Sequence, residues 1–455
     1  MVVQHNMQAA NANRMLNVTT SAQSKSTEKL SSGYKINRAA DDAAGLSISE
    51  KMRKQIKGLD KASSNAQDGV SAVQTAEGAL TEVHSMLQRM NELATQAANG
   101  TNSESDRSSI QDEIDQLTTE IDRVSETTKF NETYLLKGQS GTTNKYMAAH
   151  DAGFDGTLVD GDTKATFTMK IQAGESLKIG GTNYDIYATG SGVSDLQDKV
   201  GKLTANQEVT IDGTKYTVVD KAGVDEKANK LEATTIAAKI QAGSTVNLTP
   251  ADASKAVKAV DTSKPTSIDV ATATQKVTAE LQAANDIGAA DGKSTVTAGT
   301  ATADGTIEFA IQKGHASVAN TLSFNLHVGA DADSTNKITV NIDSMSTAGL
   351  GIKGLNVKDS TGTAATYAID AIADAISTVS SQRSSLGAVQ NRLEHTINNL
   401  DNVSENTTSA ESRIRDTDMA KEMVNYSKNN ILAQAGQSML AQANQSNQGV
   451  LSLLQ

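Results

Sequence analysis

The stretch VQTAEGALTEVHSMLQRMNELATQA, from Val73 to Ala97, decides the fold. Apolar residues recur in it every seven positions along two parallel series, which is typical of a helix that packs lengthwise against other helices. The first series is Val73, Leu80, Leu87 and Ala94, and the second is Ala76, Val83, Met90 and Ala97. The spacing predicts one long helix over about residues 62–98.

Two further helical rods show related patterns. One has apolar residues alternately four and three apart, at Ile110, Ile114, Leu117, Ile121 and Val124. The turn before it, Asn99–Ser103, holds residues that tolerate left-handed backbone and cap helices, and Asp106 suits the positive end of the helix dipole. The other repeats every seven residues, at Ile372, Val379, Leu386, Leu393 and Leu400. Arg383 and Gln390 interrupt its companion series. We expect an antiparallel helical hairpin and a third rod, forming an elongated bundle.

Both ends of the chain are proline-free and carry apolar stripes at helical spacing. The N-terminal stripe is Val2, Val3, Met7, Ala10, Met15, Leu16 and Val18. The C-terminal stripe is Leu432, Ala435, Met439, Ala443, Val450, Leu453 and Leu454. Exposed helices of this kind are an aggregation liability unless they find partners, so the ends are expected to pack on each other and on other copies. The residues assigned to self-assembly are Val3, Met7, Leu16, Leu432, Met439, Leu453 and Leu454.

The centre, residues 141–363, has a different pattern. Apolar and polar residues alternate from Ala165 to Ile171, as in a half-buried strand. Two hairpins resemble each other, Leu177–Tyr184 and Val209–Tyr216, with tight Gly-Gly and Asp-Gly turns. Helical stretches are expected after them, at 196–203 and 225–240, which suggests a duplicated β-β-α unit. Further strands are expected at 307–311, 322–328 and 338–342. The fold class is therefore a mainly α helical bundle with coiled-coil-like terminal helices and an inserted α+β or β-rich central region.

Composition narrows the function. Aromatic residues make up 3% of the chain, and Trp and Cys are absent, so a large conventional enzyme core is not expected. The net charge of -12 argues against a nucleic-acid partner. No apolar run is long enough for a membrane span, and the polar residues from Gln4 to Asn11 interrupt any signal-peptide pattern.

Motifs for catalysis, metals or cofactors are weak. Gly349, Gly351 and Gly354 match the G-x-G-x-x-G string, but extended chain is expected after them where a dinucleotide site needs a helix. A flexible turn is the preferred interpretation. Asp331 and Asp333 begin a calcium-loop pattern that lacks its later ligands. The histidines are scattered, at His5, His84, His150, His315, His327 and His395. We expect no enzyme, no metal site and no cofactor.

The polar segment from Ser26 to Leu46 reads as a helix-breaking surface loop or as a contact with other copies. Here the chain resembles bacterial flagellin. LSSGYKINRAADDAAGL, from Leu30 to Leu46, is similar to the N-terminal signature of that family. Its C-terminal counterparts are LGAVQNRL from Leu386, SRIRDTDMA from Ser412 and MLAQAN from Met439. The resemblance covers about 1–140 and 364–455, and the central region varies most in the family.

This resemblance implies a subunit of the flagellar filament, used for swimming and located outside the cell. Residues 1–45 and 415–455 would form the inner tube, 46–140 and 364–414 the helical stem, and 141–363 the outer domains. It implies export through the flagellar channel without a cleaved signal peptide, and an export chaperone that binds the C-terminal helices. The expected partner is the protein itself, as a helical homopolymer.

The resemblance also implies a host partner, the vertebrate receptor Toll-like receptor 5. Gln88–Ala94 and Gln111–Glu113 are similar to the receptor-binding surface of the family, which points to Arg89, Leu93 and Glu113. Leu93 directly precedes Ala94 of the first heptad series. We therefore expect it at the edge of the seam, the line of heptad residues that packs on other helices, and partly exposed. The sequence departs from the family at Asn91, where Arg is common. Without the resemblance, Arg89 and Glu113 read as a solvated charge pair.

Two alternatives stay open at this point. A hook–filament junction protein shares the terminal helical design but not both full signatures. A secreted adhesin or enzyme on a flagellin-like stem would use the centre, which shows no nucleophile or metal grouping, although glycan or host-surface binding would leave no such trace.

Overall fold

The computed structural model describes residues 6–188, 191–220, 223–249, 257–259, 261, 264–302, 304–359 and 361–452. They form two compact units. The first unit contains Met1–Ser71, Asn325–Thr339 and Ala388–Gln455, and the second contains Ala72–Phe324 and Val340–Gly387. Long helices dominate, and the strands lie in the middle of the chain, so the predicted mainly α class with a strand-rich centre is confirmed.

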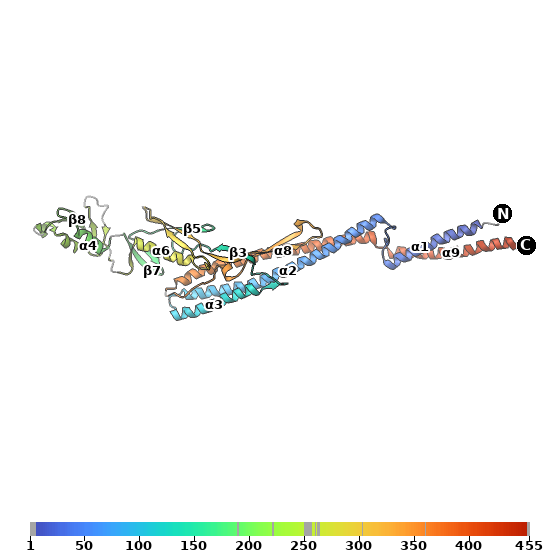
Figure 1. The fold of residues 1–455 in the computed structure, drawn as a ribbon, viewed down its shortest axis with the longest axis horizontal. Helices are drawn as coiled ribbons and strands as arrows, with labels where there is room; N and C mark the ends of the chain where they lie inside the picture. Colours follow the sequence, from blue (N-terminus) through green and yellow to red (C-terminus); the bar gives the residue numbers. More distant parts are fainter. Residues whose placement is uncertain are drawn as a thin grey trace. The chain divides into compact units, whose positions relative to one another are not determined.

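Helices α1 (Met7–Ser32) and α9 (Met419–Ser452) lie side by side in the first unit (Figure 1). Asn6 begins α1, because its side chain accepts a hydrogen bond from the Ala9 N–H (2.9 Å). The same side chain donates to the Ala443 carbonyl of α9 (3.1 Å). Gly33 ends α1 in the left-handed conformation, with φ of 77°. The predicted pairing of the two ends is therefore observed between α1 and α9.

Two short connections lie side by side: residues 33–42 link α1 to α2 (Ala43–Ala97), and residues 416–418 link α8 (Thr363–Arg415) to α9. Two backbone hydrogen bonds join these connections, from Lys35 N–H to the Arg415 carbonyl (2.6 Å) and from Thr417 N–H to the Gly33 carbonyl (2.9 Å). The expectation of a loop from Ser26 to Leu46 is wrong at both of its ends. The helices continue to Ser32 and resume at Ala43, because both flanks retain helix-forming residues and only residues 33–42 break.

Glycines inside α2 make room for a hairpin in the first unit. Strands β17 (Leu322–His327) and β18 (Lys337–Ile342) form a two-stranded sheet whose tip belongs to this unit. A methyl group at Gly69 would stand 2.2 Å from Leu326 Cδ1, and one at Gly58 would stand 2.9 Å from Ala330 Cβ. These glycines therefore allow the hairpin to lie against the helix backbone.

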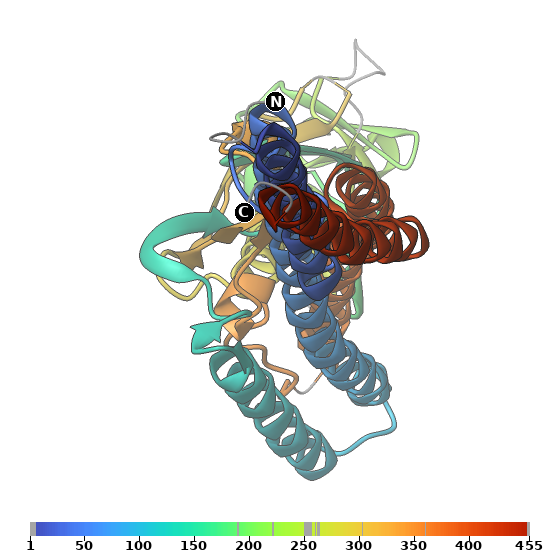
Figure 2. The ribbon, with the colours of Figure 1, turned by 90° about the vertical axis from the view of Figure 1, so that its right-hand side faces the viewer.

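The second unit contains the predicted helical hairpin. Helix α3 (Glu104–Thr127) lies beside the last part of α2, joined to it by a short turn (Figure 2). Ser103 and Asp106 form a reciprocal capping box at its start. All eight heptad residues of the opening sequence are buried at 5% exposure or less, which confirms the predicted seam. Arg383, which interrupts the third rod, pairs with Glu77 of α2 (Nη2 to Oε1, 2.7 Å).

The strands of the second unit are short and form several small sheets. The first sheets use β1 (Lys129–Phe130) with β2 (Thr133–Tyr134), and β3 (Gln139–Tyr146) with β16 (His315–Asn320). A four-stranded sheet has the order β14 (Thr295–Ala298), β15 (Thr306–Gln312), β5 (Lys164–Lys170), β4 (Thr157–Asp160). Its inner side chains, including Phe167 and Phe309, pack against α6 (Val270–Asn285). The strands predicted at 165–171, 307–311, 322–328 and 338–342 are thus confirmed.

A three-stranded sheet shares this core and carries a smaller inserted module that has a core of its own. Strands β6 (Ser176–Ile179) and β7 (Thr182–Tyr187) pair with β13 (Ser267–Asp269), and β7 and β13 are parallel neighbours. Between β7 and β13 the chain forms a second sheet in the order β10 (Lys230–Leu231), β9 (Thr214–Val218), β8 (Glu208–Ile211), β11 (Thr245–Asn247), β12 (Val257–Lys258). Helix α4 (Val193–Gly201) packs in the core of this second sheet. The module is therefore an insertion between two adjacent strands.

Two expectations for this module need correction. The duplicated β-β-α unit is wrong, because α4 packs with the hairpin that follows it rather than with the one before it. The helix expected over 225–240 is also wrong. That segment contains a 3-10 turn η2 (Glu226–Ala228), the strand β10 and a short α5 (Ala233–Ala237). Asn229 adopts φ of 56°, which interrupts a continuous helix.

The glycine string at 349–354 forms the turn that the sequence predicted. A single turn of helix, α7 (Thr347–Leu350), precedes Gly351 and Gly354, both at φ of 75°. No helix opens after them, so the geometry of a dinucleotide site is missing. Gly351 lies against Gly288, where a methyl group would stand 2.1 Å from the Gly351 carbonyl oxygen. The string therefore serves close backbone packing on the way to α8. A short 3-10 turn, η4 (Ser334–Asn336), precedes β18.

Candidate functional site

The contact between α1 and α9 is built from small side chains. Gly436 lies opposite Leu16, with 3.4 Å between Leu16 Cδ1 and the position of an added Cβ at Gly436. Ala433 is buried at 7% exposure, and Ala12 and Ala443 are half-buried. Small residues let two helix backbones approach closely, so this pair needs few large side chains between its helices.

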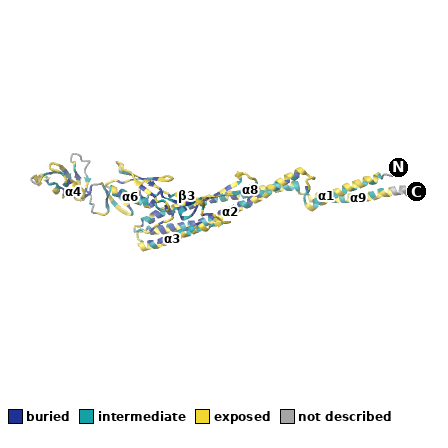
Figure 3. Ribbon diagram, viewed as in Figure 1, coloured by how far each residue is buried: buried dark blue, intermediate teal, exposed yellow. Residues whose placement is uncertain are grey.

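Most of the large apolar side chains of the two helices stay exposed to solvent in the single chain. Exposed fractions are 73% for Met7, 60% for Met15, 46% for Leu432 and 65% for Met439. Figure 3 shows the contrast with the buried faces of the second unit. The predicted pairing of the two ends is observed, but most of the large residues of the stripes remain exposed in the single chain.

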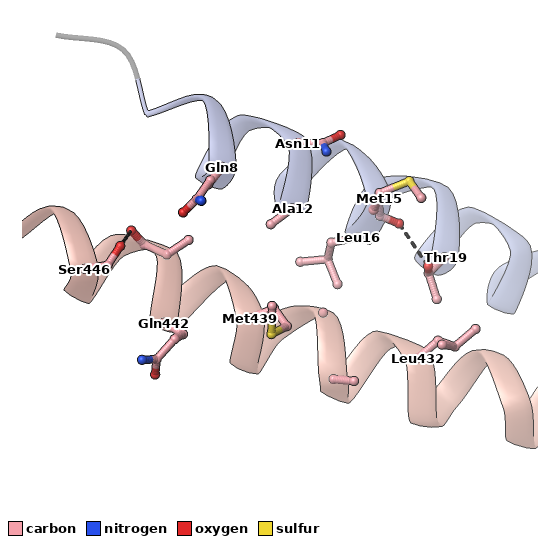
Figure 4. A pocket seen from close by; sticks show the side chains of 13 residues that line it. Gln8, Asn11, Ala12, Met15, Leu16, Thr19, Leu432, Met439, Gln442 and Ser446 are labelled. Atoms are coloured by element: carbon pink, nitrogen blue, oxygen red, sulfur yellow. Dashed lines mark hydrogen bonds between the residues drawn. The ribbon is translucent and has the colours of Figure 1, made fainter. Parts of the chain in front are cut away.

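A groove runs along one side of the α1–α9 pair, with a volume of about 680 Å³. Its apolar lining comes from both helices: Ala12, Met15, Leu16, Leu432, Ala435, Gly436, Met439 and Ala443. Polar residues such as Gln8, Gln442 and Ser446 line it near the start of α1 (Figure 4). An open apolar groove with polar ends has the anatomy of an unfilled interface.

Only part of the predicted assembly set reaches this groove. Leu16, Leu432 and Met439 line it, and Met7 is exposed on α1 without lining it. Val3, Leu453 and Leu454 lie outside the described residues. Sequence reasoning did not include Met15 and Gly436 in the site. A glycine within a long helix was the available signal for Gly436, because such a position usually marks a close approach.

The residues assigned to receptor binding come from α2 and α3 of the second unit. Arg89 Nε donates to Glu113 Oε1 (2.9 Å), and Arg89 Nη1 donates to Glu92 Oε2 (3.2 Å). The hydrogen bond to Glu113 is the main reason that the pKa of Arg89 is raised. The Arg89 and Glu113 side chains are 50% and 43% exposed, so this is a solvated charge pair that bridges two helices.

Leu93 does not share this surface. It is 2% exposed, so the expectation of a partly exposed position is wrong. Ion pairs join α2 to two helices, to α3 through Arg89 and to α8 through Glu77. Contact with two neighbours widens the buried face of α2 beyond the two heptad positions. The structure thus brings Arg89 and Glu113 together and places Leu93 in the core.

Other chemistry finds no support in the part of the chain that the structure describes. No group of three or more His, Asp or Glu side chains there has an arrangement suitable for a metal ion. None of the described helices combines the length and the apolar character needed to cross a membrane.

Comparison with known proteins identifies the family. Residues 3–141 match the bacterial flagellin N-terminal helical region, and residues 369–454 match the bacterial flagellin C-terminal helical region. Flagellin of Clostridium tyrobutyricum is 43% identical over 98% of this chain and 100% of that protein. Flagellin of Bacillus subtilis (strain 168) is 36% identical over the full length of both.

Among solved structures, FliC from Burkholderia pseudomallei is 21% identical, with a TM-score of 0.25, over 71% of this chain and 99% of that one. The assignment rests on the sequence relatives. The chain belongs to the bacterial flagellin family. It is a structural subunit of the extracellular flagellar filament and not an enzyme, so the prediction of flagellin is confirmed.

Proposed function

We propose that the groove between α1 and α9 is the surface through which copies of this chain polymerise. The observation that carries this proposal is the exposure of Met15, Leu432 and Met439 along an open groove lined by both α1 and α9. Burial of such side chains is worth roughly 1.5–3 kcal/mol each. Copies that cover one another's grooves would recover that free energy along the whole filament.

This role suggests that different parts of the chain occupy different layers of the filament. Residues 1–45 and 415–455 form the inner tube, 46–140 and 364–414 form the helical stem, and 141–363 form the outer region. The supporting observation is that the exposed apolar side chains concentrate on α1 and α9, whereas the heptad residues of α2 are already buried within the chain.

Export adds a second partner. We infer that the chain passes through the flagellar export channel largely unfolded, and that an export chaperone holds the C-terminal helices before assembly. The exposed apolar residues of α9, including Met423, Val424 and Ile431, support this inference. A chaperone that covered them would prevent premature polymerisation.

A chain that ends at residue 429 tests both roles of α9. This truncation removes the groove residues of α9 but leaves the heptad core of the second unit. We expect no filaments by electron microscopy after seeding, and weaker co-purification with the chaperone when both are expressed together, because Ile431 is lost but Met423 and Val424 remain. Filaments of normal length from the truncated chain would exclude α9 as the assembly element.

We also propose that the Arg89–Glu113 pair contributes to binding of Toll-like receptor 5. The pair is half-exposed on a rigid two-helix surface, and exposed charges at a rim affect association more than they affect folding. Leu93 would act indirectly, by holding α2 in place from the core.

Substitutions of Arg89 and Leu93 should distinguish direct contact with the receptor from structural support of α2. Arg89→Ala should weaken receptor binding severalfold and change the free energy of unfolding by less than about 0.5 kcal/mol. Leu93→Ala should destabilise the second unit by about 2–5 kcal/mol, because it creates a cavity in the core. Surface plasmon resonance and thermal unfolding measure the two effects. Unchanged binding by Arg89→Ala would refute the receptor proposal.

A further inference from the structure

A basic surface lies on the side of α2 that faces away from the core of the first unit. Its cations fall within about three helical turns: Lys51, Arg53, Lys54, Lys57 and Lys61. We call this the basic face. Lys54, Lys57 and Lys61 are exposed and spaced three and four residues apart, whereas Leu59 and Ala62 point into the core. Such a concentration of positive charge is a local exception in a chain of net charge -12.

The basic face has no partner within the described part of the chain. None of its five cations has a described carboxylate oxygen within 4.0 Å. Glu50, on the same side of α2, pairs instead with Arg415 (Oε1 to Nη1, 3.2 Å). The lysines are therefore free to meet negative charge from outside the chain.

The first unit also carries an acidic groove between α2 and α8, with a volume of about 510 Å³. Its lining residues are Asp60, Asp401, Ser404, Glu405, Thr408, Ser409 and Ser412. Ser404 donates to Asp60 Oδ1 (2.8 Å), and Ser63 donates to Asp401 Oδ1 (2.9 Å). These hydroxyl groups orient the carboxylates without neutralising them. No described cation lies within 4.0 Å of the three carboxylates.

The basic face is about as long as the groove, whose carboxylates lie at the Asp401–Glu405 end. At a rise of about 1.5 Å per residue, Lys51 to Lys61 spans about 15 Å, and Asp401 to Ser412 spans about 17 Å. Two different, complementary surfaces on one chain produce a heterologous contact, which repeats from copy to copy instead of closing into a dimer. That is the kind of contact a filament requires.

We propose that the basic face of one copy docks in the acidic groove of a neighbouring copy, and that this contact sets how adjacent subunits align. The proposal rests on the polymerisation proposed above, because it needs copies held side by side. The apolar groove of α1–α9 supplies most of the binding free energy, whereas the charged contact supplies alignment and salt sensitivity.

Charge reversal of the full chain tests this contact. Lys54→Glu with Lys57→Glu, and separately Asp401→Lys with Glu405→Lys, should each raise the critical concentration for seeded polymerisation about tenfold at low salt. The difference should shrink at about 0.5 M salt, where screening acts within a few ångströms. The chain that combines all four substitutions should recover near-normal polymerisation. Lys227→Glu with Lys230→Glu is the matched control, because it makes the same charge change on exposed lysines elsewhere.

Circular dichroism must first show that each variant keeps the wild-type helix content and melting temperature. Reversed chains that polymerise like wild type would overturn the docking contact, as would a fourfold variant no better than the twofold ones. Failure of the wild-type chain itself to polymerise would instead refute the proposed function. The two failures are therefore distinguishable.

Discussion

A chain carrying Met439→Asp should fold as a monomer and fail to polymerise. Met439 is 65% exposed and makes no core contact in the single chain, so the substitution should change the free energy of unfolding by less than about 0.5 kcal/mol. In the filament, the same position would lie under a neighbouring copy. An ionised carboxylate buried in an apolar groove costs several kcal/mol. We expect the critical concentration to rise by at least about 100-fold, which corresponds to about 2.7 kcal/mol.

Sedimentation of seeded polymer measures this effect directly. Met439→Leu is the matched control, because it keeps an apolar side chain of similar size and should polymerise nearly as well as wild type. Filaments of Met439→Asp at wild-type concentration would show that the α1–α9 groove stays open to water in the polymer. The assembly surface would then have to lie elsewhere.

Gly288→Ala should give the largest loss of stability from a single methyl group in the second unit. Gly288 adopts φ of 75°, which costs an L-residue about 1–2 kcal/mol, and the added Cβ would stand 2.1 Å from the Gly351 carbonyl oxygen. Backbone atoms cannot rotate out of the way, so the turn at 349–354 must move. We expect a loss of more than about 3 kcal/mol in the free energy of unfolding.

Gly354→Ala separates the two causes. Gly354 has the same φ of 75°, but no heavy atom lies within 4 Å of its added Cβ. This control should therefore show the backbone strain alone, about 1–2 kcal/mol. Thermal unfolding by circular dichroism compares the two, and limited proteolysis locates the segment that opens. Equal losses for the two variants would mean that the approach of Gly288 to Gly351 is not tight in solution.

The sequence predicted the long helices well because their signal repeats. Eight apolar residues occupy the two heptad positions from Val73 to Ala97, so single exceptions do not hide the helical pattern. The capping of α3 was also readable, since Ser103 and Asp106 satisfy helix N–H groups through short-range hydrogen bonds. The mainly α class and the strand-rich centre followed from these local patterns.

Faces that depend on a third neighbour were not predictable in the same way. The heptad pattern leaves Leu93 beside its two buried positions, but the structure buries it at 2% exposure. The terminal stripes predicted packing both within the chain and on other copies, and most of their large residues stay exposed in the single chain. Periodicity reports that a face is apolar, not which partner covers it.

The segment 225–240 failed for another reason. Its composition favours a helix, but Asn229 in the left-handed region and the parallel pairing of β10 with β9 decide its conformation. Parallel pairing depends on a strand elsewhere in the sequence, so no local pattern announces it.

The parallel pairing of β7 with β13 has an evolutionary consequence. Ile186 and Ile268 are cross-strand partners, so the chain leaves and re-enters the sheet on strands about 4.8 Å apart. The length of the segment between β7 and β13 has little effect on the sheet, because the entropy cost of closing a loop grows only slowly with its length. Because parallel neighbours must be joined by a connection of about a dozen residues or more, the module between β7 and β13 can be lengthened or exchanged while the pairing is preserved, but it cannot be removed entirely.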